Sequence, residues 1–475
     1  MSNLLRAMGF WMWGLIAIGL SVTLVSVSYR MVSLYRSHIS AQSAYSAASA
    51  SSAGPDSKTS TLALPPALFG ENKPAPDVGR TKVDASHQPV ISRIIAKEMT
   101  AAQQAMQAGQ WPEALQNLEA AEAQAPLTRY DSKTIQDFKG ISYVRLNKSK
   151  AAQTAYEAAL ASGFYRDQEL VKLFRVLFQL AATNGQAAKA MEYGEKAYGA
   201  GALNSNDLLI MSQLYHQQKD CKNSAVWGDK AIASFREEGV APKEVLYQLK
   251  LQCASDANNT AGMIAALYDL VRLTNKTSYW NNLIRLERQD ERDDHNTLMI
   301  YRVMYDTNSM QVDSDYIEMA QLLGDAALPG EAQLVLETAV RSGVVKEDHR
   351  ERIARLWNSM KTRAEADKKG LLALDAEAVK NSAGQLDIKL GEVYFGASDY
   401  LDAAAVISRG LGKAQIKQPD EAYVYLGRSS VAQNNPADAK NAFAQLKTLP
   451  NISARVLRLW SLYADMIPDA PLASL

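Results

Sequence analysis

Most of the chain carries a helical pattern of apolar residues. From about Ile94 to the C-terminus, apolar positions recur with the spacing of amphipathic helices, almost uninterrupted by strand signals. Gly, Asn, Asp and Pro recur between these segments, where turns are expected. Ala is abundant while Val and Ile are not, and this bias also favours helix over sheet. The pattern predicts an all-α protein, and its 475 residues exceed one ordinary core, so several domains or a repeat array are expected.

The helical pattern repeats itself along the chain. Gly140 is followed by Tyr143 at three residues, Ala152 at twelve, Tyr156 at sixteen and Ala159 at nineteen. Small residues are needed where two helices cross closely, and large residues fill the gaps between them. The same frame recurs at six other places, carried by Ala102, Ala114, Ala121 and Pro126, by Phe178, Ala190 and Ala197, by Ser212, Tyr215, Ser224 and Ala231, by Ala320, Ala332, Leu336 and Ala339, by Leu390, Gly391, Tyr394 and Ala403, and by Leu426, Gly427, Ala439, Phe443 and Pro450.

These units resemble tetratricopeptide repeats, whose pattern joins Leu-Gly, Tyr, Ala, Phe and Pro at these offsets. The resemblance implies a right-handed α-solenoid of helical hairpins over 91–450, closed by a capping helix and tail at 451–475. A generic helical bundle would also be Ala-rich, but it would not repeat these offsets so often. Residues 243–315 and 345–382 match weakly, as degenerate repeats or as a different helical insertion. In such an array each hairpin contacts only its neighbours.

The N-terminal region predicts a membrane helix. No charged residue occurs from Ala7 to Tyr29, a length that spans a bilayer core, and Trp11, Trp13 and Tyr29 stand at its ends as interface anchors. The alternative is a cleaved signal peptide, whose apolar region is shorter and ends at a small-residue site. We expect an uncleaved span at about 8–29 within a region 1–38. A flexible linker rich in Ser, Ala and Pro follows at 39–90.

The orientation of this helix is nearly balanced by charge. Arg6 and the α-amino group lie before the span, while Arg30 and Arg36 follow it, so the positive-inside rule gives almost a tie. A short N-terminal tail before a long C-terminal domain favours export of the bulk of the chain. The expected topology is therefore a single-pass anchor with the repeat array exported across the membrane.

Two cysteines fall at neighbouring positions of the repeat frame. Cys221 lies at the turn into the second helix of the fourth unit, and Cys253 lies late in the first helix of the fifth. Consecutive helices are antiparallel, so the start of one lies beside the end of the next. The frame predicts a possible disulfide, which would need an oxidising compartment, and two inert buried thiols are the alternative.

Composition and motifs argue against several functions. Lys and Arg total 51, as do Asp and Glu, so the chain has no basic excess for nucleic acid. No CxxC, HExxH, GxSxG or Walker A motif occurs, and the mixed acids and His at 290–296 are interpreted as a solvated loop or helix end. We therefore expect no enzyme, no catalytic residue, no metal, no cofactor and no small-molecule substrate, although an unrecognised active site is the alternative.

The first helices of such an array line its concave surface. The groove-facing polar positions in the repeat frame are Arg145, Arg175, Gln179, Gln213, His216, Asn281, Arg285, Arg288 and Arg428. Arginine suits carboxylates because its guanidinium bonds them bidentately. This pattern favours an extended peptide or an acidic C-terminus as ligand, while ordinary solvated faces are the alternative. The predicted function is a membrane-anchored scaffold for protein partners.

A narrower resemblance involves the order of segments. The stretches at 279–305, 315–345 and 385–411 resemble bacterial tetratricopeptide proteins that accompany TonB-ExbB-ExbD-type energy-transduction systems. That resemblance implies an envelope accessory that sits in the inner membrane, single-pass with its repeat array in the periplasm, and supports a transport complex through protein contacts. The alternative is an assembly or chaperone-like factor for envelope polysaccharide or secretion machinery.

Overall fold

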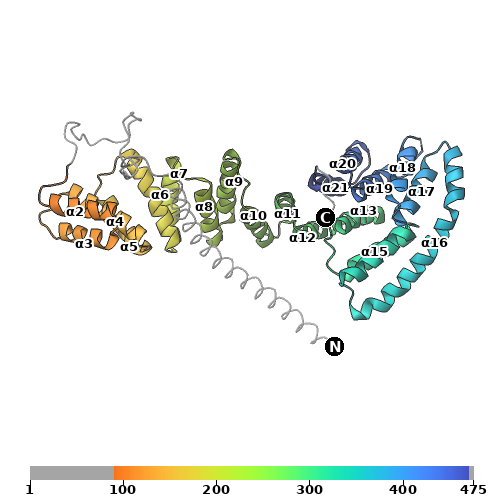
Figure 1. The fold of residues 1–475 in the computed structure, drawn as a ribbon, viewed down its shortest axis with the longest axis horizontal. Coiled ribbons are helices and arrows are strands. Elements are labelled where there is room, and N and C mark those ends of the chain that lie inside the picture. Colours follow the sequence, from red (N-terminus) through yellow and green to blue (C-terminus); the bar gives the residue numbers. More distant parts are fainter. Residues whose placement is uncertain (1–89, 414, 470–475) are drawn as a thin grey trace, which may run out of the picture. The chain divides into compact units, whose positions relative to one another are not determined.

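The computed structural model describes residues 90–413 and 415–469, and the regular elements in these ranges are helices (Figure 1). The α-helices are α2 (Ala96–Gln107), α3 (Trp111–Glu122), α4 (Arg129–Arg145), α5 (Ser149–Ala161), α6 (Asp167–Thr183), α7 (Ala187–Gly199), α8 (Ser205–Gln217), α9 (Cys221–Glu237), α10 (Glu244–Asp256), α11 (Thr260–Thr274), α12 (Thr277–Arg288), α13 (Asp294–Asp306), α14 (Asp313–Asp325), α15 (Pro329–Ser342), α16 (Arg350–Lys380), α17 (Gln385–Gly396), α18 (Tyr400–Leu411), α19 (Pro419–Ala432), α20 (Pro436–Gln445) and α21 (Ala454–Met466). Short 3₁₀ turns lie at Glu347–His349 and Leu446–Thr448.

Local sequence sets the ends of these helices. At the start of α4, Thr128 and Asp131 form a capping box, in which the Asp131 N–H donates to Thr128 Oγ1 over 3.0 Å and the Thr128 N–H donates to Asp131 Oδ2 over 3.0 Å. Asn204 and Asp207 cap α8 in the same way. Several hairpin turns contain a residue with positive φ, for example Asn147 at 56°. Asn tolerates this left-handed conformation better than most residues, which explains its recurrence in the turns.

Glycine is required where the two helices of a hairpin cross. A Cβ at Gly140 would lie 2.7 Å from the ring of Tyr156, and a Cβ at Gly427 would lie 2.5 Å from the ring of Phe443. Both aromatic residues stand sixteen positions after their glycine. The repeated offset in the sequence therefore reflects one packing contact, in which a large side chain of the second helix fills the place of a missing Cβ on the first.

The first ten helices, α2–α11 (96–274), form five successive hairpins that we call the N-terminal array. Within each hairpin the two helices pack against each other, and each hairpin packs on the next. First helices of consecutive units also approach each other, as α6 does α8 and α8 does α10. Because these first helices approach each other more closely than the second helices of consecutive units do, they lie on the inner side of the local curvature.

The remaining helices, α12–α21 (277–466), form what we call the C-terminal array. Its hairpins are α14–α15, α17–α18 and α19–α20, while α12 and α13 pack more loosely on each other. Helix α16 is a single helix of 31 residues, so the weakly matching stretch 345–382 is not a hairpin repeat. The stretch 243–315 holds the hairpin α10–α11 and the helices α12 and α13.

The last helix corrects the expectation of a simple terminal cap. Helix α21 packs on α20, as a cap does, but it also contacts α11 and α13, more than 150 residues earlier in the chain (Figure 1). The indole N–H of Trp460, which is fully buried, donates to the Met299 carbonyl oxygen over 3.2 Å. Arg458 donates to the Glu287 carboxylate at 2.9 and 3.1 Å. The contacts of the C-terminal array are therefore not limited to neighbouring hairpins. Helix α21, for which an apolar face was predicted, therefore packs against α20 and also against α11 and α13.

The predicted membrane segment lies outside the described residues. Each helix in the described part of the chain is too short or too polar to span a bilayer core. This finding does not apply to residues 1–89, which lie outside the described residues. They include the span expected at about 8–29, its anchors Trp11, Trp13 and Tyr29, and nearly all of the linker.

Candidate functional site

Several predicted groove residues join the first helices of consecutive units. Asp207 on α8 accepts from Arg175 Nε at 2.7 Å and from Gln179 Nε2 at 2.9 Å, both on α6. Arg285 on α12 donates to Asp315 on α14 at 2.8 Å. Arg288 donates to Glu318 at 2.9 Å, and its guanidinium lies 4.8 Å from the centre of the Tyr301 ring.

These pairs change what the arginines can do. Each carboxylate comes from the next unit along the chain, 28 to 32 residues later. The guanidiniums of Arg175, Arg285 and Arg288 already have carboxylate partners, so an acidic peptide would have to displace an internal one. These pairs fix the register of neighbouring units and also occupy polar positions on the inner surface.

Two of the nine predicted groove residues lie in the interior, which corrects the expectation for them. Asn281 is 5% exposed and donates to the Ser309 carbonyl oxygen over 2.7 Å. Arg428 is 5% exposed and bonds Asp306 with two nitrogens, at 2.8 and 3.0 Å. Both belong to the C-terminal array, where additional helices cover the face that would be open in a serial array.

The other predicted positions retain solvent access. Arg145 at the end of α4 is exposed, and its guanidinium lies 5.6 Å from the centre of the Trp111 ring in the preceding unit. Gln213 and His216 on α8 are half-buried. Arg145 is therefore the predicted groove arginine that best fits contact with an external partner.

The two cysteines meet where the repeat frame places them. Cys221, the first residue of α9, and Cys253, in the last turn of α10, form a disulfide with Cα atoms 5.6 Å apart. The Nδ1 atom of His216, in the last turn of α8, lies 3.3 Å from Cys253 Sγ. Three helix ends therefore bring two sulfurs and one imidazole nitrogen together.

A buried ion-pair network in the C-terminal array was not foreseen from the sequence. Arg302 on α13 is fully buried and donates to Glu331 on α15 at 2.9 and 3.2 Å. It also pairs with Glu421 on α19 at 2.8 Å. Arg428, also on α19, bonds both Glu331 and Asp306 on α13. No sequence motif predicts these residues, because they come from α13, α15 and α19, which meet only when the C-terminal array folds back on itself.

The network holds strongly shifted acids and bases. Burial opposes ionisation of Glu331, but the charges of Arg302 and Arg428 outweigh it and lower the pKa of Glu331 to about 2. The Tyr425 hydroxyl donates to the same carboxylate over 2.5 Å. Burial raises the pKa of Tyr425 well above its ordinary value, so the phenol stays protonated. Each arginine of the network has a carboxylate partner, which is the arrangement of a structural ion-pair network.

Glu392 on α17 lies at the edge of this network. Burial raises the pKa of Glu392 to about 7, a rise that Lys389 opposes and Glu421 increases. Its carboxylate is 3.1 Å from Lys389 Nζ. His295 on α13 interacts electrostatically with Arg302 and Glu421 of the network and pairs with Asp420 on α19 at 2.8 Å, and this hydrogen bond raises the pKa of His295 despite burial.

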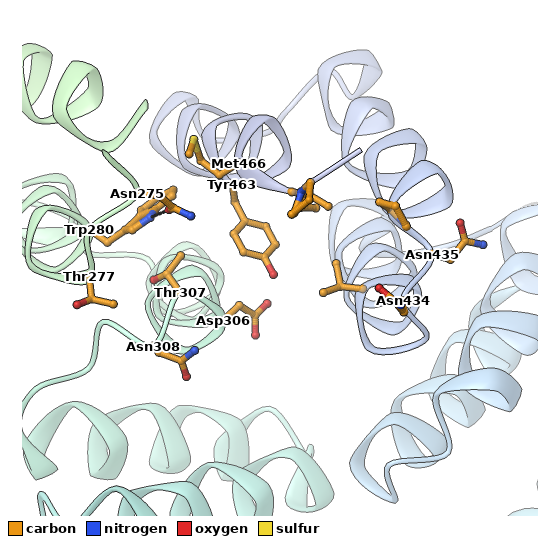
Figure 2. Close-up of a pocket in the computed structure, with 14 residues that line it drawn as sticks. Asn275, Thr277, Trp280, Asp306, Thr307, Asn308, Asn434, Asn435, Tyr463 and Met466 are labelled. Atoms are coloured by element: carbon orange, nitrogen blue, oxygen red, sulfur yellow. Dashed lines mark hydrogen bonds between the residues drawn. The ribbon is translucent and has the colours of Figure 1, made fainter. Parts of the chain in front are cut away.

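A pocket of about 350 Å³ lies beside the network (Figure 2). Figure 2 shows the Tyr463 ring of α21 pointing toward Thr307 and Asp306 at the end of α13. Amide and hydroxyl side chains from the start of α12 and from the turns after α11, α13 and α19 complete the wall, namely Asn275, Thr277, Asn308, Asn434 and Asn435. The pocket lies between α21, the end of α13, the start of α12 and the α19–α20 turn.

No protein-family model and no curated protein matches the chain. Solved structures similar to it include a tetratricopeptide repeat protein from Parabacteroides merdae ATCC 43184, at 12% identity over 78% of this chain and 99% of that one, with a TM-score of 0.25. They also include the TPR2AB domain of yeast Sti1 in a pHSP90 complex, at 14% identity over 56% of this chain and 98% of that one, with a TM-score of 0.29. Similarity this weak carries no argument about function, so the repeat assignment rests on the hairpin packing described above.

Proposed function

We propose that this protein is a non-enzymatic scaffold that binds a protein partner through the N-terminal array. The observation that carries the proposal is the row of first helices on the inner side of that array. Consecutive hairpins hold these helices in fixed register through pairs such as Arg175 with Asp207. A row of parallel helices in fixed register offers an extended partner a series of equally spaced contacts.

The proposed ligand is an extended segment of a partner protein. Arg145 is exposed at the end of a first helix, with Val144 beside it 42% exposed. An arginine next to an apolar side chain suits a segment that combines a carboxylate with an apolar residue. Because Arg175 already holds Asp207, we assign the acid-binding role to the Arg145 end of the array.

The membrane part of the proposal rests on the sequence. We propose that a helix at about 8–29 anchors the chain in the inner membrane and that 39–90 link it to a periplasmic array. The uncharged run from Ala7 to Tyr29 and the disulfide Cys221–Cys253 support this location, because disulfides persist in oxidising compartments. An accessory role in a TonB-type energy-transduction system is the specific form of the proposal. Partners from polysaccharide or secretion machinery would favour the assembly-factor alternative.

Crosslinking in intact cells tests the proposal. A photo-crosslinking residue at Val144 samples a first helix, and one at Val226, which is 45% exposed on the second helix α9, is a matched control. We expect a defined partner from position 144 and not from 226. Equal yields from both positions, or none from 144, would contradict the proposed surface.

A charge reversal tests the role of Arg145. Arg145→Glu should reduce partner capture at least about tenfold, since it replaces attraction to a carboxylate with repulsion. Lys150→Glu makes the same charge change at an exposed position on the second helix of the same hairpin and should leave capture unchanged.

Removal of residues 1–38 tests the membrane anchor and should release the chain from the membrane fraction. Continued sedimentation with membranes would contradict the anchor and leave the partner surface untouched.

A further inference from the structure

The ends of α8, α9 and α10 bring His216, Cys221 and Cys253 to one point. One ligand atom from each residue lies within 4.8 Å of the others, and His216 Nδ1 is 3.3 Å from Cys253 Sγ. A disulfide sulfur is a weak hydrogen-bond acceptor, so the imidazole gains little from this contact in the oxidised protein. Two thiolates and an imidazole are, however, the donor set that soft metal ions prefer.

We propose that the reduced form of this cluster is a binding site for one thiophilic cation with a filled d shell, Cu(I) or Zn(II), and that the disulfide and the metal exclude each other. The two sulfurs cannot bond to each other and serve as two thiolate ligands at the same time. Oxidation of the pair therefore closes the site, and reduction opens it.

The reduction step is a simple exchange. A dithiol reductant breaks the Cys221–Cys253 bond, each sulfur gains one electron and one proton, and the reductant leaves as a cyclic disulfide. Metal binding then displaces one proton from each thiol, because thiolates are the ligands. The cation replaces the lost covalent link between α9 and α10.

The distances suit this exchange. Metal–sulfur bonds of about 2.3 Å and metal–nitrogen bonds of about 2.1 Å place ligand atoms about 3.5–4 Å apart. His216 Nδ1, 3.3 Å from Cys253 Sγ, is already close to this separation, whereas the two sulfurs are bonded to each other and must move apart after reduction. Cα atoms 5.6 Å apart allow the cysteine side chains to make that change by rotation. Three protein ligands satisfy trigonal Cu(I), while Zn(II) would add a water as its fourth ligand.

Access and rigidity also favour a site at this point. All three residues are half-buried, so a reductant and an ion can reach them. Each stands at a helix end, and the helices pack on one another, α8 with α9, α9 with α10 and α8 with α10. The ligands are thus carried by three rigid elements rather than by a loop, which is the arrangement that orders a metal site.

The test uses the purified full chain reduced with a trialkylphosphine, which is oxidised to the phosphine oxide as water supplies the protons. Cu(I) is titrated in competition with bicinchoninate in one arm, and Zn(II) in competition with a chromophoric chelator in the other. We expect one equivalent to bind in at least one arm, and none to bind the oxidised chain. Absence of one-equivalent binding in both arms would overturn the proposal.

Variants assign the ligands. Cys221→Ser with Cys253→Ser should abolish binding under the same reducing conditions. His216→Ala should weaken it at least about tenfold, while His349→Ala, a half-buried histidine elsewhere, should leave it unchanged. Equal affinity of the two histidine variants would overturn the three-ligand site.

A second measurement needs no variant. In the reduced wild-type chain, bound metal should protect both thiols from maleimide labelling, as measured by mass. Two labels in the presence of one equivalent of metal would contradict the site even if a cysteine variant failed to fold.

Discussion

The N-terminal and C-terminal arrays use the same hairpin but are stabilised in different ways. In the N-terminal array, polar contacts such as Arg175 with Asp207 join residues one unit apart, 32 positions along the chain. In the C-terminal array, Arg302 with Tyr425 and Arg458 with Glu287 span 123 and 171 positions. Apart from α11, which α21 also contacts, the first array is a series of local interfaces, whereas the second depends on closure.

This difference predicts different responses to damage. A serial array has a stability that is close to a sum of units and their interfaces, so a change at one unit stays local. A closed array loses several interfaces together when one closing contact fails. The predictions below break or sharpen that contrast, from the largest expected effect to the smallest.

Arg302→Met should have the largest effect. It removes the partner of Glu421 and one of two arginines that bond Glu331, both buried, so we expect a loss of about 3–5 kcal/mol. Denaturant unfolding monitored by hydrogen exchange should show α13, α15 and α19 destabilised together. The matched change Arg175→Met removes an arginine that is partly exposed and leaves Asp207 with its hydrogen bonds from Gln179 and the α8 N-terminus, so it should cost about 1 kcal/mol or less. Similar costs for the two would refute the contrast.

Loss of the disulfide should be the next largest effect. Cys221→Ser with Cys253→Ser opens a covalent loop of 32 residues and should cost about 3–4 kcal/mol through the entropy of the unfolded chain. Hydrogen exchange under native conditions should locate the loss at α8–α11 and leave α13, α15 and α19 unchanged. Equal loss of protection in the C-terminal helices would show that the two arrays unfold as one.

The stability of the C-terminal array should depend on pH. Because the pKa of Glu392 is about 7 in the folded chain and 4.5 in the reference state, the folded form binds more protons between these values. Stability should therefore fall as pH rises from about 4.5 to 7, by about 1–3 kcal/mol. The raised pKa of His295 acts in the same direction, since its contribution is lost as pH rises through the folded value.

The Glu392→Gln variant is the control for this pH dependence. It removes the titrating proton and should flatten the fall between pH 4.5 and 7, while the loss below pH 4.5 caused by the low pKa of Glu331 should remain. Midpoints of denaturant unfolding across this range provide the measurement. An unchanged slope in Glu392→Gln would mean that another group titrates.

Arg288→Ala should have the smallest effect. Its pair with Glu318 lies in the C-terminal array, yet both side chains are partly exposed, at 27% and 48%, and the contact spans only 30 positions. We expect a loss of about 0.2–1 kcal/mol, measured by denaturant unfolding. A loss comparable to that of Arg302→Met would show that location in the closed array matters more than burial.

The repeat frame was accessible to sequence reasoning because it reflects local packing. Gly140 contacts Tyr156 and Gly427 contacts Phe443, each pair within a single hairpin, so the spacing can be seen in the amino-acid sequence. The repeat frame also predicted that Cys221 and Cys253 lie close together, since consecutive helices are antiparallel. The positions of Asn281 and Arg428 did not follow, because a hairpin taken alone leaves those faces open.

Outside 243–315 and 345–382, the amino-acid sequence by itself determined the helical hairpins and their turns, because these depend on contacts between residues fewer than about forty positions apart. Within those two stretches it left open whether the helices form repeats, and the structure shows the single long helix α16 in the second. Only the tertiary structure decided that α21 returns to α11 and α13 and that Arg302 and Arg428 share buried carboxylates. Most of these contacts join residues more than ninety positions apart, as Arg428 with Glu331 does, and the pair of Arg302 with Glu331 is 29 positions apart. No local pattern marks either kind, since an arginine on a helix face looks the same in sequence whether solvent or another helix covers it.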